Sequence, residues 1–503
     1  MAEAEGSPGS LPSGSTGMYA LMNTQHYNAE GVGKSSDWTP ERVALTGRNV
    51  GLVIAGGVAF GLFAVVMQLY WIAAAIGGSL LVGLVAWQFE SALVLYALVA
   101  FVPWGRTPDM ATGGSGVGKG LYVTEIMLGF LLAVWFGKYI FGTLPKNRIA
   151  SGFYVPMGLY LGYCLINVWN SFLFWDIHVN RRYQYPTVNF VEIGLHALSV
   201  GALVMMATSI SSRKWLNRVT VALMVAGAYH CVNGLLGGRI PIQAPWGSLL
   251  LLLPACYLWA IVLDPGQSWL RRGLAAGAVA LAVLTVFVLS ISWVSGWLGL
   301  FVALGVVTFI KSRKTFFALL AVVCVTCLVA WPFLHKNVVE ESQSGGDYDR
   351  FALMAGAVKY ASAFPLGVGL GNYRTYNSFY YGEKWGTTSY TSAHGTYSQH
   401  LSEMGFPGLV LFVSILIFGF RWMWVNYRAM LPGPSKTYLL AAMGQLVGIS
   451  AAAFIGDYII PTYHNGGIVT FSTAVYSWLI WGLAIAHVRI SRDEANGSLD
   501  CHS

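Results

Sequence analysis

Charged residues are scarce in this sequence. Only 10% of its 503 residues are Asp, Glu, Lys or Arg, whereas 56% are hydrophobic and the mean hydropathy is +0.59. Soluble domains carry about 25% charged residues, so the composition excludes an ordinary water-soluble domain. Apolar runs of about 20 residues, the length that crosses a bilayer as a helix, recur from residue 49 to residue 487. The sequence therefore predicts an all-α, multi-pass membrane protein.

Accessible cysteines are also scarce. Most of the six cysteines lie in apolar runs, including the C-x-x-C pair Cys324 and Cys327. A redox or zinc motif needs polar, accessible surroundings, so we expect these thiols to serve packing. The outward loops hold no cysteine nucleophile, which argues against an exosortase-like peptidase. We expect neither a metal nor a cofactor.

Acidic residues are fewer than basic ones, which gives a formal charge of +8. Such an excess can indicate nucleic-acid binding, but membrane proteins concentrate Lys and Arg in their cytoplasmic loops. Placing the amino terminus in the cytoplasm puts most Lys and Arg on the inner side, including the clusters SSRKWLNR, SWLRRG and KSRK. We therefore interpret the charge as a topology signal and expect no nucleic-acid partner.

The apolar runs predict about fourteen transmembrane helices. They lie near residues 49–67, 69–87, 90–104, 121–142, 152–175, 190–210, 218–236, 247–264, 273–291, 293–310, 315–334, 406–426, 437–456 and 467–487. The predicted layout is a cytoplasmic, largely disordered tail (1–48), a bundle of about eleven spans (49–334), a large outward loop (335–405), three final spans (406–487) and a cytoplasmic tail (488–503).

The outward loop is roughly 70 residues long, far longer than a usual connection, so it should have structure or function of its own. The stretch DYDRFALMAGAVKYASAFP predicts a helix that Pro365 ends. Its apolar stripe is formed by Phe351, Met354, Ala355 and Val358.

Two further stretches follow in this loop. GVGLGN at 367–372 is a glycine-dense turn that lets the backbone come close to another chain or a ligand, and it contains Gly369 and Gly371. HGTYSQHLSEMG predicts a second helix that leads into the next span.

His394 lies near the start of this second helix, with Ser392 as a candidate cap. The helix dipole there disfavours an imidazolium, so the ring should stay neutral. A neutral imidazole can take a proton from an attacking hydroxyl. The same position also suits a surface histidine that forms hydrogen bonds at the membrane interface.

Several cations face outward. Arg350, at the start of the first loop helix, can pair with the neighbouring acids or grip a phosphate bidentately. Arg181, Arg182 and Arg239 lie in other outward loops, where lipid headgroups are the simplest partners. The last outward loop adds polar residues that could line the same cleft: Asp457, Tyr463 and His464.

Together, the Arg-led helix DRFALMAGAVKYASAFP, the turn GVGLGNY and the segment HGTYSQHLSEMGFPGL resemble the O-antigen ligase and O-antigen polymerase superfamily of bacterial inner-membrane glycosyltransferases. The family pattern H-N-x-Y-L-Q-x-L-x-E-x-G-x-x-G-L is matched at His394, Tyr397, Gln399, Leu401, Glu403, Gly405, Gly408 and Leu409. Two features depart from the family. Gly395 replaces the usual Asn, and LSISWVSGWLGLFVAL lacks the arginine of the family's Ser-Arg-Gly.

The resemblance implies metal-independent transfer of a glycan from an undecaprenyl-diphosphate carrier to an acceptor hydroxyl, on the periplasmic face of the inner membrane. It implies that His394 is the base and that Arg350 binds the diphosphate. The second cation would come from Arg239, Arg181 or Arg182. Supporting residues would be Tyr397, Gln399, Glu403, Gly369 and Gly371, and sugar rings could stack on Tyr373, Tyr376, Tyr380 and Trp385.

The sequence leaves alternatives open. The acceptor hydroxyl can belong to a glycan, a lipid or a protein, so polymerase, ligase and protein O-oligosaccharyltransferase all remain. A lipid-glycan transporter or flippase is the main rival from another class, although its ionisable residues would usually lie mid-span. The third alternative is that the protein is a non-catalytic scaffold for envelope assembly. The missing Ser-Arg-Gly arginine is consistent with this function.

Overall fold

The computed structural model describes Val85 and residues 88–102, 123–144, 151–179, 186–236, 247–289, 294–335, 348–380, 392–463 and 468–497. The chain divides into two compact units, Met1–Leu80 and Leu81–Ser503, and all described residues belong to the second. The predicted N-terminal tail, the first span and most of the second lie outside the described residues. Every regular element within the described ranges is a helix, which confirms the predicted all-α class.

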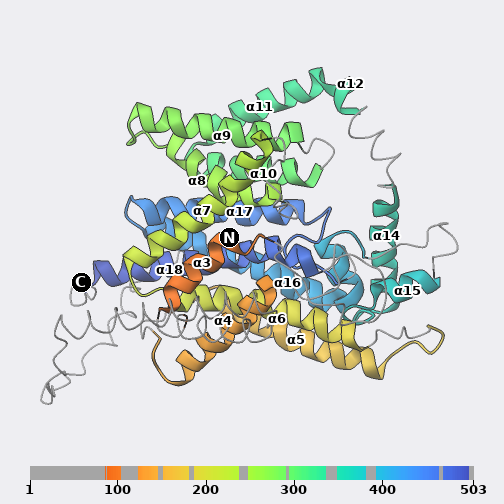
Figure 1. The fold of residues 1–503 in the computed structure, drawn as a ribbon. Helices are drawn as coiled ribbons and strands as arrows, with labels where there is room; N and C mark the ends of the chain where they lie inside the picture. The colour runs from red at the N-terminus through yellow and green to blue at the C-terminus, as the bar shows by residue number, and fades with distance from the viewer. Residues whose placement is uncertain are drawn as a thin grey trace, which may run out of the picture. The chain divides into compact units, whose positions relative to one another are not determined.

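Figure 1 shows these helices. In chain order they are α3 (Phe89–Val99), α4 (Val123–Ile140), α5 (Tyr154–Leu173), α6 (Thr187–Ser209), α7 (Arg213–Leu235), η1 (Gly247–Leu251), α8 (Leu252–Val262), α9 (Trp269–Leu289), α10 (Val294–Lys311), α11 (Arg313–Val329), α12 (Trp331–Leu334), α14 (Tyr348–Ala363), α15 (Tyr373–Tyr380), α16 (Thr396–Ala429), α17 (Pro434–Ala452), η3 (Ile468–Thr470) and α18 (Phe471–Ala495).

Helix α18 lies inside the bundle, where it contacts α4, α6, α7 and α17. Its residues 471–490 are all buried, as expected of a helix in a core. Polar side chains tie it to its neighbours, because Trp481 Nε1 donates to Gln445 Oε1 on α17 and Tyr476 Oη donates to the Ala97 carbonyl on α3, both at 2.8 Å. Buried polar groups that are satisfied in this way fix how neighbouring helices pack.

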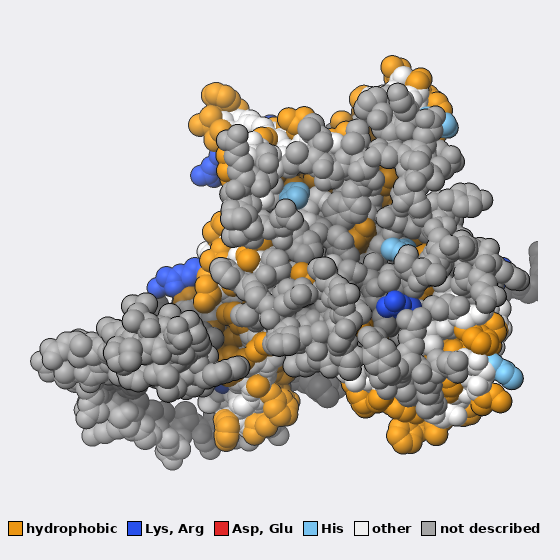
Figure 2. All heavy atoms as spheres, turned by 45° about the vertical axis from the view of Figure 1, so that its right-hand side comes forward, with side chains coloured by type: hydrophobic (Ala, Val, Ile, Leu, Met, Phe, Trp, Pro, Cys, Tyr) orange, Lys and Arg blue, Asp and Glu red, His pale blue; other side chains and the backbone are white. Residues whose placement is uncertain are grey.

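The described helices have the length and surface of membrane spans. Within the described residues, five are long and apolar enough to cross a bilayer: Thr187–Ser209, Trp269–Phe287, Val294–Lys311, Thr396–Ala429 and Phe471–Ala495. Large apolar side chains also remain at the surface, as Figure 2 shows for one face. Apolar surface on this scale marks contact with lipid or partners. The protein is a multi-pass membrane protein.

The remaining predicted spans that fall in the described ranges are helical as well, in α3, α4, α5, α7, α8, α11 and α17. The total number of spans stays a prediction. Two helices extend beyond the ends of the membrane spans that the sequence predicts. α16 begins at Thr396, inside the predicted outward loop, and α18 continues to Ala495, with Arg489 still buried.

Candidate active site

The outward loop contains a small core of its own. Leu353 and Tyr360 of α14 pack against Tyr373 and Tyr376 of α15, and the rings of Tyr360 and Tyr373 meet edge to face at 5.7 Å. Tyr373 Oη also donates to the Leu353 carbonyl at 3.0 Å. Ala393, the residue before His394, is buried in the same cluster. This loop core, which also includes Val179, therefore joins the first loop helix to the histidine segment.

The predicted first loop helix is confirmed, because α14 runs from Tyr348 to Ala363 and ends before Pro365. The predicted apolar stripe is wrong at Ala355 and Val358, whereas Met354 is half-buried and the Phe351 side chain lies outside the described residues. Val358 is 55% exposed and Ala355 is exposed, whereas the buried positions are Leu353, Ala357, Tyr360 and Ala361. The reason is tertiary packing, since α14 lies against α16 and its Tyr360 ring meets Tyr373 of α15.

This packing also changes the predicted stacking residues. Tyr373 and Tyr376 are buried inside the loop core, so their rings are not available to a sugar. Tyr380 is exposed, and Trp385 lies outside the described residues.

The glycine turn lies directly on the first turns of α16. Gly367, Gly369 and Gly371 have φ of 86°, 95° and 76°, in the left-handed region that favours glycine. The Val368 N–H donates to the Ser402 carbonyl at 3.0 Å, and the Gly369 N–H donates to the Glu403 carbonyl at 2.9 Å. Within the described residues, the close backbone approach that these glycines allow is made to α16 of the same chain, and an approach to a ligand stays a prediction.

A break in α16 makes room for this turn. Gly405 has a φ of 67° inside the helix, and the Phe406 N–H donates to the Pro365 carbonyl at 3.1 Å. From α5, Asn167 Nδ2 donates to the Glu403 carbonyl at 3.1 Å and Tyr163 Oη donates to the Met404 carbonyl at 2.9 Å. The carbonyls freed by the break are thus satisfied by side chains of a neighbouring helix.

Gln399 and Glu403 hold the histidine segment and the glycine turn on α16. Glu403 Oε1 accepts the backbone N–H of Tyr373 at 3.1 Å, and Gln399 Oε1 accepts the backbone N–H of Ala393 at 2.8 Å. Both side chains are buried. Tyr397 Oη donates to the Ser450 carbonyl of α17 at 3.0 Å. These three residues therefore position the chain around His394.

His394 lies immediately before α16, as predicted, and is partly exposed. Its φ of 50° makes it the only non-glycine residue in the left-handed region among the described residues. Such a conformation costs about 1–3 kcal/mol and persists where the surroundings impose it, often at functional sites. Here the buried Ala393 and the anchored Thr396 impose it, since the Thr396 N–H donates to the Ala453 carbonyl at 2.9 Å.

Ser392 is not the cap of this helix, so that prediction is wrong. The N-cap position is Gly395, and no side chain caps it. Ser392 Oγ instead accepts the backbone N–H of His394 at 3.1 Å. The left-handed backbone at His394 lies between Ser392 and the start of the helix.

A buried polar cluster under the histidine segment was not predicted. His400 Nδ1 lies 2.6 Å from the Thr396 carbonyl, which can only accept, so this nitrogen carries the proton. Nε2 of a neutral His400 then accepts from Tyr160 Oη at 2.6 Å, and Tyr160 in turn accepts from His196 Nδ1 at 2.9 Å. This chain of hydrogen bonds connects α5, α6 and α16.

The cluster borders a small cavity of about 10 Å³, room for one water molecule. Its polar lining includes Glu192, Glu403, Gln399 and Thr462. Glu192 Oε1 accepts the Tyr463 N–H at 2.6 Å, which ties the last outward loop to α6. The sequence held a signal for this cluster, because Glu192 and His196 lie one helical turn apart in an apolar span, where ionisable residues are rarely placed without a role.

The segment after α5 is tied to α15. Tyr380 Oη donates to Asp176 Oδ2, and this hydrogen bond lowers the pKa of Asp176 and raises the pKa of Tyr380 to about 12. The backbone N–H of Asp176 donates to Tyr376 Oη at 3.1 Å. Val179 then enters the loop core.

The predicted cations are only partly described. Arg350 lies in the first turn of α14, and its side chain is outside the described residues. Arg181, Arg182 and Arg239 are also outside them, as is His464. Asp457 and Tyr463 are buried beside the polar cluster. Sequence reasoning missed Arg374, which follows Tyr373 on α15 and is partly exposed.

Residues 278–413 match the family model described as O-antigen ligase. The matched range begins in α9 and ends in α16, so it contains both loop helices, the glycine turn and His394. The chain is thus a membrane enzyme of the glycosyltransferase type. It carries a domain of the O-antigen ligase family, as the resemblance of its motifs predicts. No curated protein matches the sequence.

Proposed function

We propose that this protein transfers a glycan from an undecaprenyl-diphosphate carrier to an acceptor hydroxyl. The observation that carries the proposal is the convergence of three separate motifs. The Arg350 helix, the glycine turn and the His394 segment meet around one loop core within the O-antigen ligase domain. Lipid-linked glycans are the general substrate class of this family.

His394 would act as the base. It would take the proton of the acceptor hydroxyl while that oxygen forms a bond to the anomeric carbon. The bond from this carbon to the diphosphate oxygen would break at the same time, which inverts the sugar centre and releases the lipid diphosphate. The left-handed backbone and the two anchored neighbours support this role, because they fix the backbone that carries the imidazole before substrate arrives.

Arginines would stabilise the charge that grows on the leaving diphosphate. Preorganised cations in a partly dry site stabilise such charge more strongly than water does. We assign this role to Arg350. A second cation would come from Arg374 on α15, or from Arg181 or Arg182, which follow the buried Val179 closely in sequence. Arg239 is a further candidate for the second cation.

The chemistry requires a topology, which we also propose. The protein would lie in the bacterial inner membrane with about fourteen spans and both termini in the cytoplasm, so that the loop at 335–405 faces the periplasm. Arg350, His394 and the glycine turn would then meet lipid-linked donors where nucleotide sugars are absent. The acceptor could be a glycan, a lipid or a protein.

The test is a transfer assay with the purified full-length protein in detergent. An undecaprenyl-diphosphate-linked glycan serves as donor, and candidate acceptors are a second lipid-linked repeat, a lipid A core and a Ser- or Tyr-containing protein. Product with any of them supports glycan transfer and identifies the acceptor class. If none gives product, while the protein moves the lipid-linked glycan across vesicles, the protein is a flippase instead.

A further inference from the structure

A second hollow, of about 630 Å³, lies where α16 and α18 end. Figure 1 shows the end of α18 on the side of the bundle opposite α14 and α15. The hollow is enclosed by the start of α7, the ends of α16 and α18, and the connection from α16 to α17. No part of the O-antigen ligase match reaches it, because that match ends at residue 413. Glycan transfer at His394 therefore does not explain this hollow.

The hollow carries more positive than negative charge. Arg213, Lys436 and Arg492 line it, and Glu494 is the one carboxylate among its described lining residues. Glu494 pairs with Arg213, whose Nε donates to Glu494 Oε1 at 2.8 Å. Lys436 Nζ donates to the Met430 carbonyl, and Arg492 donates to Asn426 Oδ1, both at 2.7 Å. These acceptors are neutral. Because Glu494 balances Arg213, Lys436 and Arg492 give the lining of the hollow an excess of two positive charges.

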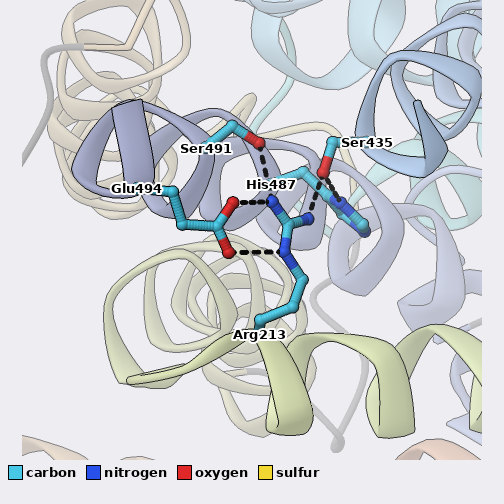
Figure 3. Close-up of polar contacts among 5 residues, drawn as sticks. All are labelled: Arg213, Ser435, His487, Ser491 and Glu494. Carbon is cyan, nitrogen blue, oxygen red and sulfur yellow. Dashed lines mark hydrogen bonds and ion pairs between the residues drawn. The ribbon is translucent and has the colours of Figure 1, made fainter. Parts of the chain in front are cut away.

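One wall of the hollow is fixed in advance by a hydrogen-bond network (Figure 3). The Arg213 guanidinium contacts Ser435 Oγ at 2.5 Å and Ser491 Oγ at 3.2 Å, in addition to Glu494. Ser435 Oγ also lies 3.0 Å from His487 Nδ1, and both of these residues are buried. A rigid wall of this kind lowers the entropic cost of ordering side chains around a ligand.

The neighbouring backbone adds to the positive potential. Helix α17 starts at the hollow with Pro434, and no side chain caps its first turn. Ser435 Oγ accepts from Arg213 and does not cap the free backbone N–H groups in the first turn of α17. The positive end of the α17 dipole thus adds to Lys436 and Arg492.

The surroundings place the hollow at a membrane surface. Helices α16 and α18, which enclose it, are both among the candidate spans. Trp424 and Tyr427 precede it on α16, and aromatic residues gather at the headgroup level of a bilayer. Leu431, in the lining of the hollow, is 84% exposed. A cationic hollow with an apolar rim at this depth suits the headgroup and upper acyl chains of an anionic lipid.

We propose that this hollow binds a phosphate group through Lys436, Arg492 and the first turn of α17. The phosphate can belong to the headgroup of an anionic phospholipid or to free phosphate in the aqueous phase. The lining apolar residues favour the lipid.

Thermal unfolding of the purified full-length protein in detergent tests the proposal. The probes are phosphatidylglycerol, phosphatidylcholine and inorganic phosphate, each titrated separately. Phosphatidylglycerol should raise the melting temperature saturably, and phosphatidylcholine should not, because its choline neutralises the phosphate. Stabilisation by inorganic phosphate that also competes with phosphatidylglycerol assigns the site to free phosphate, and its absence assigns the site to lipid.

Matched variants locate the effect. The double variant Lys436→Gln/Arg492→Gln should weaken the apparent affinity about tenfold or more, since each Lys or Arg near an anionic surface contributes about a kcal/mol. Lys436→Arg should keep it. Arg421→Gln/Arg428→Gln removes two exposed charges of α16 outside the hollow and should change nothing.

Two results would overturn the proposal. One is equal stabilisation by phosphatidylglycerol and phosphatidylcholine. The other is equal weakening in the hollow and control variants, which would mean that general surface charge attracts the lipid. If the double variant fails to fold, Lys436→Met alone is compared with Lys436→Arg. Equal affinity of these two variants for phosphatidylglycerol would also overturn the proposal.

Discussion

The backbone N–H of Tyr373 donates a 3.1 Å hydrogen bond to Oε1 of Glu403. This bond joins the helix after the glycine turn to the helix after His394. Because Glu403 is buried, loss of its carboxylate would leave the Tyr373 N–H without its protein acceptor. The arrangement makes Glu403 a positioning residue for the site.

Glu403→Ala should lower the free energy of unfolding by about 1–3 kcal/mol, the cost of a buried N–H without an acceptor. Glu403→Gln keeps an oxygen that can accept from Tyr373 and should lose less. Thermal or denaturant unfolding in detergent measures the difference. Equal stability of both variants and the parent protein would show that this bond does not hold the turn.

Gly367→Ala should be strongly destabilising. A Cβ at this position would lie 2.2 Å from the Glu403 carbonyl oxygen, and the φ of 86° is strained for any side chain. We expect a loss of about 2 kcal/mol or more and reduced transfer activity. Gly158→Ala on α5, where nothing lies within 4 Å of the new Cβ, is the matched control and should be neutral or slightly stabilising. Similar melting temperatures for the two variants would contradict the close packing of the turn.

Tyr160→Phe should destabilise the bundle by about 1–3 kcal/mol, because His196 and His400 would both lose their shared partner in a buried place. The control is Tyr139→Phe on α4, whose ring is exposed and whose hydroxyl can be replaced by solvent. Unfolding curves of both variants measure the effect. A loss no larger at Tyr160 than at Tyr139 would exclude the proposed hydrogen-bond chain.

The docking of α15 should depend on pH at both extremes. The pKa of Asp176 is lowered by the hydrogen bond from Tyr380, so its contribution is present above the unfolded pKa of about 3.9 and is lost as pH falls through the lower folded value. The pKa of Tyr380 is raised to about 12, so its contribution is present below about pH 10 and is lost as pH rises toward 12. Solvent screens this pair, so the effect should be small.

Hydrogen exchange in α15 is the suitable measurement for this pH dependence. Protection should fall at the acid and alkaline ends in the parent protein. Tyr380→Phe, which cannot donate to Asp176, should remove the response of this pair. An unchanged pH profile in Tyr380→Phe would assign the response to other groups.

Local sequence patterns predicted the helices of this site well. Pro365 ended α14 because proline cannot continue a helix, and the period of HGTYSQHLSEMG indicated the start of α16. The buried face of α14 was predicted wrongly, because partners distant in sequence decide which side of a short amphipathic helix is covered. Tyr360 packs on Tyr373, and no periodicity within α14 contains that information.

Contacts between distant residues account for the other differences. Tyr160 meets His400 across 240 positions of sequence, so only the folded bundle reveals their hydrogen bond. Ser392 looked like a cap because serine precedes a helical pattern, yet the left-handed His394 turns the chain before Gly395 takes that position. Such a backbone conformation depends on anchors on both sides, here Ala393 and Thr396.

The most direct test of the account is the rate of glycan transfer by His394→Ala, measured with purified protein and an undecaprenyl-diphosphate-linked donor. Its matched control is His335→Ala, an exposed histidine that ends the α11–α12 region. Loss of a general base typically costs about 10²–10⁴-fold in rate. If His394 is the base, His394→Ala should show a loss of this size with an unchanged melting temperature, and His335→Ala should show no loss. Transfer at the parent rate by His394→Ala would contradict the account.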